Sequence, residues 1–209
     1  MQTGWNENQV LLRGVVAEAP VFSHENHGTD YDLFPLLVPR LSGVEDRLNV
    51  VAPRTMLAGL DLSPGAGLEV SGEVRSFNNR SGPGSRLVIT VFARSMAASQ
   101  AEAANQLVLT GVLCKPPILR RTPLGREICD MMLAVNRKYG RADYLPCIAW
   151  GGLAQRCGGL AVGDAVRLEG RLQSRNYQKV VDGQTQERTA FEISVMRMGP
   201  AVEPEAADT

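Results

Sequence analysis

The chain has 209 residues, of which 44% are hydrophobic and 21% charged, and its formal net charge at pH 7 is zero. No apolar run approaches the roughly 20 residues that a membrane-spanning helix needs. The start, MQTGWNENQ, lacks the basic and apolar regions of a secretory signal. We therefore expect a cytoplasmic globular protein with two small domains or one larger one and no membrane partner.

The neutral total hides an uneven distribution of charge. Residues 1–99 contain 8 Lys and Arg against 10 Asp and Glu, a balance of −2, whereas residues 100–198 contain 14 against 9, a balance of +5. Residues 199–209 add three acids and no base. A basic half within a neutral chain is typical of an anion-binding surface.

The first predicted strand, in NQVLLRGVVAEAP at Asn8–Pro20, reappears 97 residues later as NQLVLTGVLCKPP at Asn105–Pro117. After one extra residue the offset becomes 98, and residues 62–78 align with residues 160–176. Matches spread over about 90 residues with a single gap predict two copies of one structural unit.

The second copy shows five strand-length segments, with a short helix between the third and the fourth. This order is that of the OB-fold, a five-stranded Greek-key barrel that often binds oligonucleotides; a β-sandwich shares the strand count but does not usually need the helix. We predict an all-β protein of two tandem OB-fold units. The expected strands are 106–113, 127–135, 144–150, 165–173 and 189–198, and the expected helix is 151–157.

Composition suggests where the units begin and end. The first OB-fold unit is predicted over 1–95, a small and polar linker over 96–104, and the second unit over 105–198. The Pro-, Ala- and acid-rich tail 199–209 is predicted to be disordered.

Neither the cysteines nor the histidines indicate a metal or a cofactor. The four cysteines, Cys114, Cys129, Cys147 and Cys157, form no Cys-x-x-Cys pair, and their irregular spacing predicts reduced, mostly buried thiols. The pair His24 and His27 lies in the polar run SHENHG. We favour a plain surface loop here, and a metal bound between these two histidines is the alternative.

The second copy resembles the bacterial single-stranded DNA-binding protein family over its whole OB domain. The motifs that carry the resemblance are NQLVLTGVL, PPILRRTPLGREI, LAVNR, IAWGGLAQRC, VGDAVRLEGRLQSRNY and FEISVMRM, which follow in the family's order and close to its spacing. The first copy keeps NQVLLRGVVAEAP and VSGEVRS and resembles the family more faintly.

The resemblance implies four aromatic residues that stack on bases, namely Tyr139, Tyr144, Trp150 and Tyr177. Every base exposes a flat face, so aromatic stacking is largely independent of sequence, and basic side chains then hold the phosphates. The expected phosphate contacts are Arg120, Arg121, Arg126, Arg137, Lys138, Arg171, Arg175 and Lys179. Two alternatives stay open. The first is core packing: strand aromatics are commonly packing residues, and Ile148 shares the parity of Tyr144 and Trp150, so that this face is also compatible with the barrel interior. The second is that Arg120 and Arg121 are merely solvated.

The first copy has no ring at any of the four places. The aligned residues are Ser42, Arg47, Pro53 and Asn79. We hypothesise that this unit kept the barrel and lost most of the binding, and that it serves assembly or another partner. Alignment across loops is loose, so Phe77 and Trp5 are candidate substitute rings.

The predicted function is sequence-tolerant binding of single-stranded DNA, mainly by the second unit, in replication, repair, recombination or the maintenance of mobile elements. The alternative is an OB-fold scaffold, like the primosome proteins of this fold, that contacts a helicase or a mobilisation enzyme. RNA is a third possibility, because only 2′-hydroxyl contacts distinguish it from DNA. No catalytic motif is present, and Asp130 and Asp143 have no partner set for a metal-dependent nuclease.

Family members with one OB unit commonly form homotetramers, so a chain with two units is expected to form a homodimer with four. Members usually end in a strongly acidic tail with a hydrophobic tip that recruits replication and repair enzymes. Here the end is EPEAADT, which is weakly acidic and has no aromatic tip. This departure puts recruitment by that route in doubt, and an accessory or mobile-element role stays open beside a housekeeping one.

Overall fold

The computed structural model of the chain describes residues 7–79, 87–137, 140–181 and 183–201. These residues divide into two compact units. The N-terminal unit comprises Val10–Gln106 together with Leu172–Phe191, and the C-terminal unit comprises Leu107–Arg171 with the described parts of Met1–Gln9 and Glu192–Thr209.

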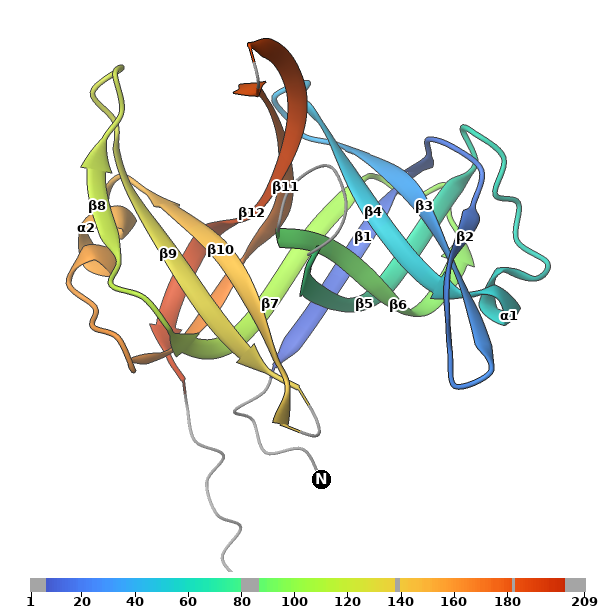
Figure 1. The fold of residues 1–209 in the computed structure, drawn as a ribbon, viewed down its shortest axis with the longest axis horizontal. Helices are drawn as coiled ribbons and strands as arrows, with labels where there is room; N and C mark the ends of the chain where they lie inside the picture. The colour runs from blue at the N-terminus through green and yellow to red at the C-terminus, as the bar shows by residue number, and fades with distance from the viewer. Residues whose placement is uncertain (1–6, 80–86, 138–139, 182, 202–209) are drawn as a thin grey trace, which may run out of the picture. The chain divides into compact units, whose positions relative to one another are not determined.

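The N-terminal unit is built on a closed five-stranded barrel. Following the hydrogen-bonded neighbours, its strands run β1-β3-β4-β6-β5 and back to β1, and β2 extends the sheet beyond β3 (Figure 1). All pairings are antiparallel except that of β4 with β6. The elements are β1 (Asn8–Val16), β2 (Val21–Asn26), β3 (Thr29–Pro39), β4 (Glu45–Pro53), α1 (Arg54–Leu57), β5 (Gly67–Asn78) and β6 (Leu87–Ala98).

The C-terminal unit repeats this plan. Its barrel runs β7-β9-β10-β12-β11 and back to β7, with β8 on the outer side of β9 and β10 parallel to β12. The elements are β7 (Ala104–Leu113), β8 (Ile118–Arg121), β9 (Glu127–Asn136), β10 (Ala142–Trp150), α2 (Gly152–Gly158), β11 (Ala165–Val181) and β12 (Gln184–Pro200).

The two barrels close in the same register. Val15 pairs with Leu37 in the first barrel, and Val112 pairs with Ala134 in the second, each position shifted by the 97 residues of the sequence repeat. Counted along the chain and without the edge strand, the helix of each barrel lies between the third and fourth strands: α1 between β4 and β5, and α2 between β10 and β11. The prediction of an all-β chain with two tandem OB-fold units and this helix is therefore confirmed.

Aliphatic side chains fill both barrels, because alternate residues of each strand point inward. The barrel also forces two strands to cross closely at glycines. A Cβ on Gly111 would lie 2.5 Å from the carbonyl oxygen of Ala134, and a Cβ on Gly170 would overlap the carbonyl oxygen of Ser194. The equivalent residues of the first barrel, Gly14 and Gly72, are equally crowded by backbone. This crowding is the physical reason why both copies carry glycine at these points.

Some elements differ from the sequence prediction. The edge strands β2 and β8 were not predicted, and β11 and β12 each run for 17 residues, beyond the predicted 165–173 and 189–198. β12 continues to Pro200, two residues into the predicted tail, and residues 202–209 lie outside the described part. The contact-based unit boundaries also depart from the predicted ones, because Leu172–Phe191 groups with the first barrel. No helix in the described ranges is both long enough and apolar enough to cross a membrane.

Candidate nucleic-acid interface

Two of the predicted stacking rings lie on the outward face of β10. Their neighbours Leu145, Cys147 and Ala149 are buried in the barrel, whereas Tyr144 is 48% exposed and Trp150 is 41% exposed. The alternative that these two rings fill the barrel interior is therefore wrong. Their role in binding remains a prediction.

The surface around these rings is formed by three adjacent strands. In the antiparallel register Trp150 lies opposite Ile128 of β9, which in turn lies opposite Arg120 of β8. Tyr144 lies opposite Ala134 of the same strand β9. Directly opposed side chains are about 5 Å apart. The face thus combines exposed rings, an apolar floor and a cation at its rim.

The two rings act at separate places. They are six residues apart along one strand, which corresponds to about 20 Å at ~3.3 Å per residue. Two rings at this separation cannot contact each other or the same base. Ile148 lies between them on the same face but is buried, so it is part of the apolar surface beneath the rings and does not offer a third contact to a base.

Three of the predicted phosphate contacts already have carboxylate partners. Arg120 pairs with Asp130, and the hydrogen bond that the guanidinium donates to this carboxylate raises the pKa of Arg120. Arg121 lies 3.3 Å from Glu127. These pairs are largely exposed, and a phosphate would have to compete with the carboxylates for the same guanidinium groups.

Arg137 has a different environment. Its Nε donates to Oδ2 of Asp143 at 2.5 Å, and Asp143 is completely buried. The backbone amide of Arg137 donates to the carbonyl of Arg141 at 2.7 Å, closing the turn that leads into Tyr144. A guanidinium bound to a buried carboxylate is costly to displace, so the geometry favours a turn-holding role over a phosphate contact.

Other cations of the C-terminal unit have no carboxylate partner among the described residues. Predicted members of this set are Arg126 and Arg171, and sequence reasoning missed Lys115, Arg141 and Arg156. The Nε of Arg171 is buried and has no hydrogen-bond partner within the described part of the chain. An unsatisfied buried donor is unfavourable, and an incoming anion would relieve it.

The remaining predicted residues lie outside the described part of the C-terminal unit. Arg175, Tyr177 and Lys179 belong to the N-terminal unit, where the Arg175 guanidinium lies 5.8 Å from the centre of the Tyr177 ring. Lys138 and Tyr139 lie outside the described residues. The structure thus divides the predicted set between the two units.

The first barrel differs in charge as well as in rings. Arg47, at the place of Tyr144, pairs with Glu18 at 2.5 Å, and Pro53 stands at the place of Trp150. Every described arginine between Val10 and Gln106 has a carboxylate partner. Those arginines are Arg13, Arg40, Arg47, Arg54, Arg75 and Arg94.

The structure also shows an aromatic cluster that the sequence reasoning did not find. His24 stacks on Tyr31 at 4.9 Å between ring centres, and Tyr31 lies 5.6 Å from Phe92. The Arg94 guanidinium lies 5.0 Å from the centre of Phe92. His24 is therefore a stacking residue, and no group of three or more potential metal ligands occurs within the described ranges. The sequence alone does not indicate this cluster, because Phe92 and Arg94 are distant in sequence from His24 and Tyr31.

Comparisons with known proteins agree with this geometry. Residues 104–200 match the model of the "Single-strand binding protein family". "Single-stranded DNA-binding protein 2" of Listeria innocua is 37% identical over 81 residues, which is 35% of this chain and 51% of that protein. "Single-stranded DNA-binding protein A" of Bacillus subtilis is 38% identical over 81 residues, covering 35% and 47%. The match thus spans about half the length of these relatives.

A solved structure resembles nearly the whole chain. The wild-type single-stranded DNA binding protein from Thermus aquaticus superposes with a TM-score of 0.76, covering 98% of this chain and 97% of that chain at 24% identity. At this identity the likeness establishes the fold of both units. The family match covers residues 104–200, so the similarity in sequence to single-strand binding proteins is that of the second unit.

Proposed function

We propose that the chain binds single-stranded DNA without sequence preference and without catalysis, mainly through the outward face of β8, β9 and β10. The observation that carries this proposal is the pair of exposed rings, Tyr144 and Trp150, on a single strand face. The names of the relatives, which are single-stranded DNA-binding proteins, support it.

Stacking and charge have separate tasks in this proposal. Each ring receives one base, and stacking of a base on an aromatic side chain contributes about 1–3 kcal/mol. Arg126 and Arg171, which need not abandon a carboxylate, hold the phosphates. Arg120 and Arg121 contact phosphates only where a phosphate displaces their carboxylate partners, Asp130 and Glu127. Duplex DNA hides its base faces, so the site selects single strands.

The chain is proposed to work in the cytoplasm as a homodimer, which would bring four OB units together. The argument is the presence of two barrels in each chain, in a family whose single-barrel members commonly form tetramers. Light scattering at micromolar concentration should give twice the chain mass of 22.6 kDa. A mass of one chain at that concentration would contradict the dimer.

A salt-dependent titration tests the proposed function. Equal lengths of single-stranded DNA, duplex DNA and RNA are titrated by fluorescence anisotropy at several salt concentrations. Single-stranded DNA should bind far more tightly than duplex. The slope of log affinity against log salt should fall in magnitude by about 0.7 in Arg171→Ala, since each phosphate contact on a single strand contributes about that much. Equal binding of duplex, or affinity that does not depend on salt, would refute the proposal. Tight binding to RNA would extend it to both nucleic acids.

A further inference from the structure

Asp130 places a carboxylate on the outward face of the C-terminal unit, among the groups proposed to hold DNA. In the strand register it lies between Ile118 of β8 and Ile148 of β10. Trp150 is the next residue of β10 on the same face, so it lies diagonally across from Asp130, at about 7–8 Å between such positions. A carboxylate this close to a base-stacking ring repels the phosphates of the strand that the ring would hold.

Asp130 also occupies Arg120, the cation at the rim of this face. The Nε of Arg120 donates to Oδ2 of Asp130, so the pair cancels its own charge at the place where a phosphate contact is proposed. The Arg120 side chain is 51% exposed and that of Asp130 is 37% exposed. Ion pairs that water can reach in this way contribute little to stability. The pair can therefore open without cost to the fold.

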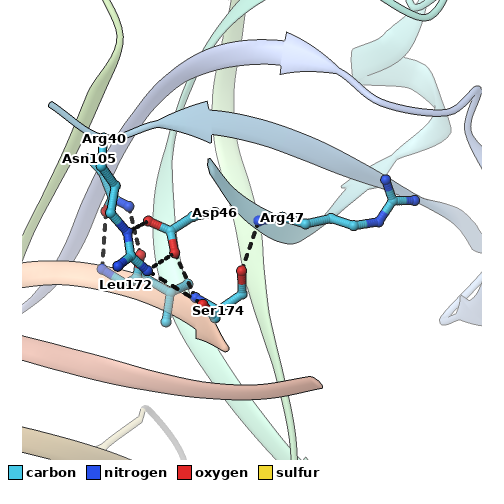
Figure 2. A network of polar contacts seen from close by, with 6 residues as sticks. All are labelled: Arg40, Asp46, Arg47, Asn105, Leu172 and Ser174. Carbon is cyan, nitrogen blue, oxygen red and sulfur yellow. Dashed lines mark hydrogen bonds and ion pairs between the residues drawn. The ribbon is translucent and has the colours of Figure 1, made fainter. Parts of the chain in front are cut away.

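Burial distinguishes this pair from an arginine–carboxylate pair that holds a barrel together. Figure 2 shows such a pair in the N-terminal unit, where Arg40 donates to Asp46 through two guanidinium nitrogens. The Asp46 side chain is completely buried, and it also accepts from the backbone amide of Ser174 at 2.8 Å. Opening that pair would leave an uncompensated buried charge. Asp130 is partly exposed, so its release from Arg120 carries no such penalty.

Displacement of Asp130 exchanges one anion for another at Arg120. When a phosphate takes the guanidinium, the released carboxylate attracts a cation from solution. This uptake offsets the cation that the phosphate gives up, so the contact adds little to the affinity or to its salt dependence. An unpaired guanidinium at the same place would add a full phosphate contact.

We propose that Asp130 is an internal competitor of the DNA phosphates, which keeps Arg120 paired and lowers the affinity at the Trp150 end of the site. This inference rests on the proposed function, because the competition matters only if single-stranded DNA binds this face. Asp130 thereby sets the affinity and the salt response of the site through Arg120. The strand is held at this end mainly by its bases.

The test is Asp130→Asn, which removes the charge and keeps the shape of the side chain. In an anisotropy titration with oligo-dT at low salt, the variant should bind roughly two- to fivefold more tightly than the wild type, a gain of the size of one exposed ion pair. The slope of log affinity against log salt should grow in magnitude by about 0.7, which corresponds to one added phosphate contact on a single strand.

Asp164→Asn is the matched control for net charge. Asp164 is an exposed aspartate of the same unit, in the turn between α2 and β11, and its carboxylate accepts from the Ala161 amide at 2.8 Å. Its substitution should leave the affinity and the salt slope nearly unchanged. Equal effects of the two substitutions would overturn the inference, and so would an Asp130→Asn chain that binds no more tightly than the wild type.

A second comparison tests the part played by Arg120. In an Arg120→Ala chain, the further change Asp130→Asn should have no more effect than Asp164→Asn has in the wild type. If Asp130→Asn still tightens binding several-fold without Arg120, the carboxylate acts by repulsion alone, and the proposed competition is wrong.

The proposed function fails in a different way. It fails if the wild type binds no oligo-dT, or if it binds duplex DNA as tightly as single strands. A wild type that prefers single strands, together with an Asp130→Asn chain of unchanged affinity and salt slope, refutes the further inference and preserves the proposed function.

Discussion

Replacing both exposed rings of β10 by alanine should cause a large loss of affinity for single-stranded DNA without unfolding the barrel. Tyr144 and Trp150 each leave nearly half of their surface in water, so their truncation removes little of the core. Substitutions at such surface positions usually change the free energy of unfolding by within about 0.5 kcal/mol. The variant Tyr144→Ala/Trp150→Ala therefore separates binding from folding.

The magnitude follows from the separation of the rings. Since they lie about 20 Å apart and contact different bases, their contributions should be nearly additive. At about 2 kcal/mol for each stacked base, one substitution weakens binding roughly 30-fold and the pair weakens it roughly 1,000-fold. The single variants Tyr144→Ala and Trp150→Ala measure the energy of one stack directly.

The assay is an anisotropy titration with oligo-dT at fixed salt, accompanied by denaturant unfolding of each protein. Phe22→Ala is the matched control, because Phe22 is also an exposed ring on a strand but belongs to the first barrel. Its substitution should leave the affinity nearly unchanged. If the double variant binds within about threefold of the wild type, or if Phe22→Ala causes the same loss, base stacking by these two rings is not what holds the strand.

Three further predictions concern the scaffold. Gly170→Ala should lower the free energy of unfolding by about 1–3 kcal/mol in urea, because a methyl group there overlaps backbone of β12. The hydrogen bonds from Arg54 lower the pKa of Asp32. The stability that they provide is therefore present above the ordinary pKa of 3.8 and is lost as the pH falls toward the lower pKa of Asp32 in the folded protein. In Asp32→Asn the free energy of unfolding should depend less on pH in this acid range. Burial raises the pKa of Cys157 to about 11, so a thiol reagent at pH 8 should modify the half-exposed Cys114 first, as peptide mapping will show.

The barrel plan was predictable because it depends on local patterns. Alternation in AVRLEGRLQ, the helix between the third and fourth strands, and the 97-residue offset all survive in the structure as β11, α2 and the shared closing register. The glycines were visible too, although only the crossing of strands explains them. These features depend on residues that are close together in the chain, so the sequence alone is enough to predict them.

Features that depend on distant partners were not predictable. The count of basic residues suggested that Arg120, Arg121 and Arg137 are equivalent, but the fold pairs each of them with a different carboxylate. Likewise, nothing in the run QSRNYQKV indicates that Ser174 is bound by Asp46, 128 residues earlier. The charge available to a phosphate therefore depends on the three-dimensional pairing rather than on composition.

The difference between the two barrels follows from the same pairing. Glu73 stands where the second copy has Arg171, and it forms ion pairs with Arg75 and Arg94. The single carboxylate of Glu73, which replaces an arginine of the second copy, thus pairs with two arginines of the first barrel. The first barrel is therefore rich in charge and still offers little to an anion.

The most direct measurement of the central claim is the fluorescence of Trp150 during strand binding. The chain has two tryptophans, so Trp5→Phe leaves Trp150 as the single reporter. If a base stacks on this exposed indole, oligo-dT should quench its emission strongly, and the quenching should saturate at the same dissociation constant as the anisotropy. Binding that proceeds to saturation while the Trp150 emission stays constant would show that the ring does not touch the bases, and the account would be contradicted.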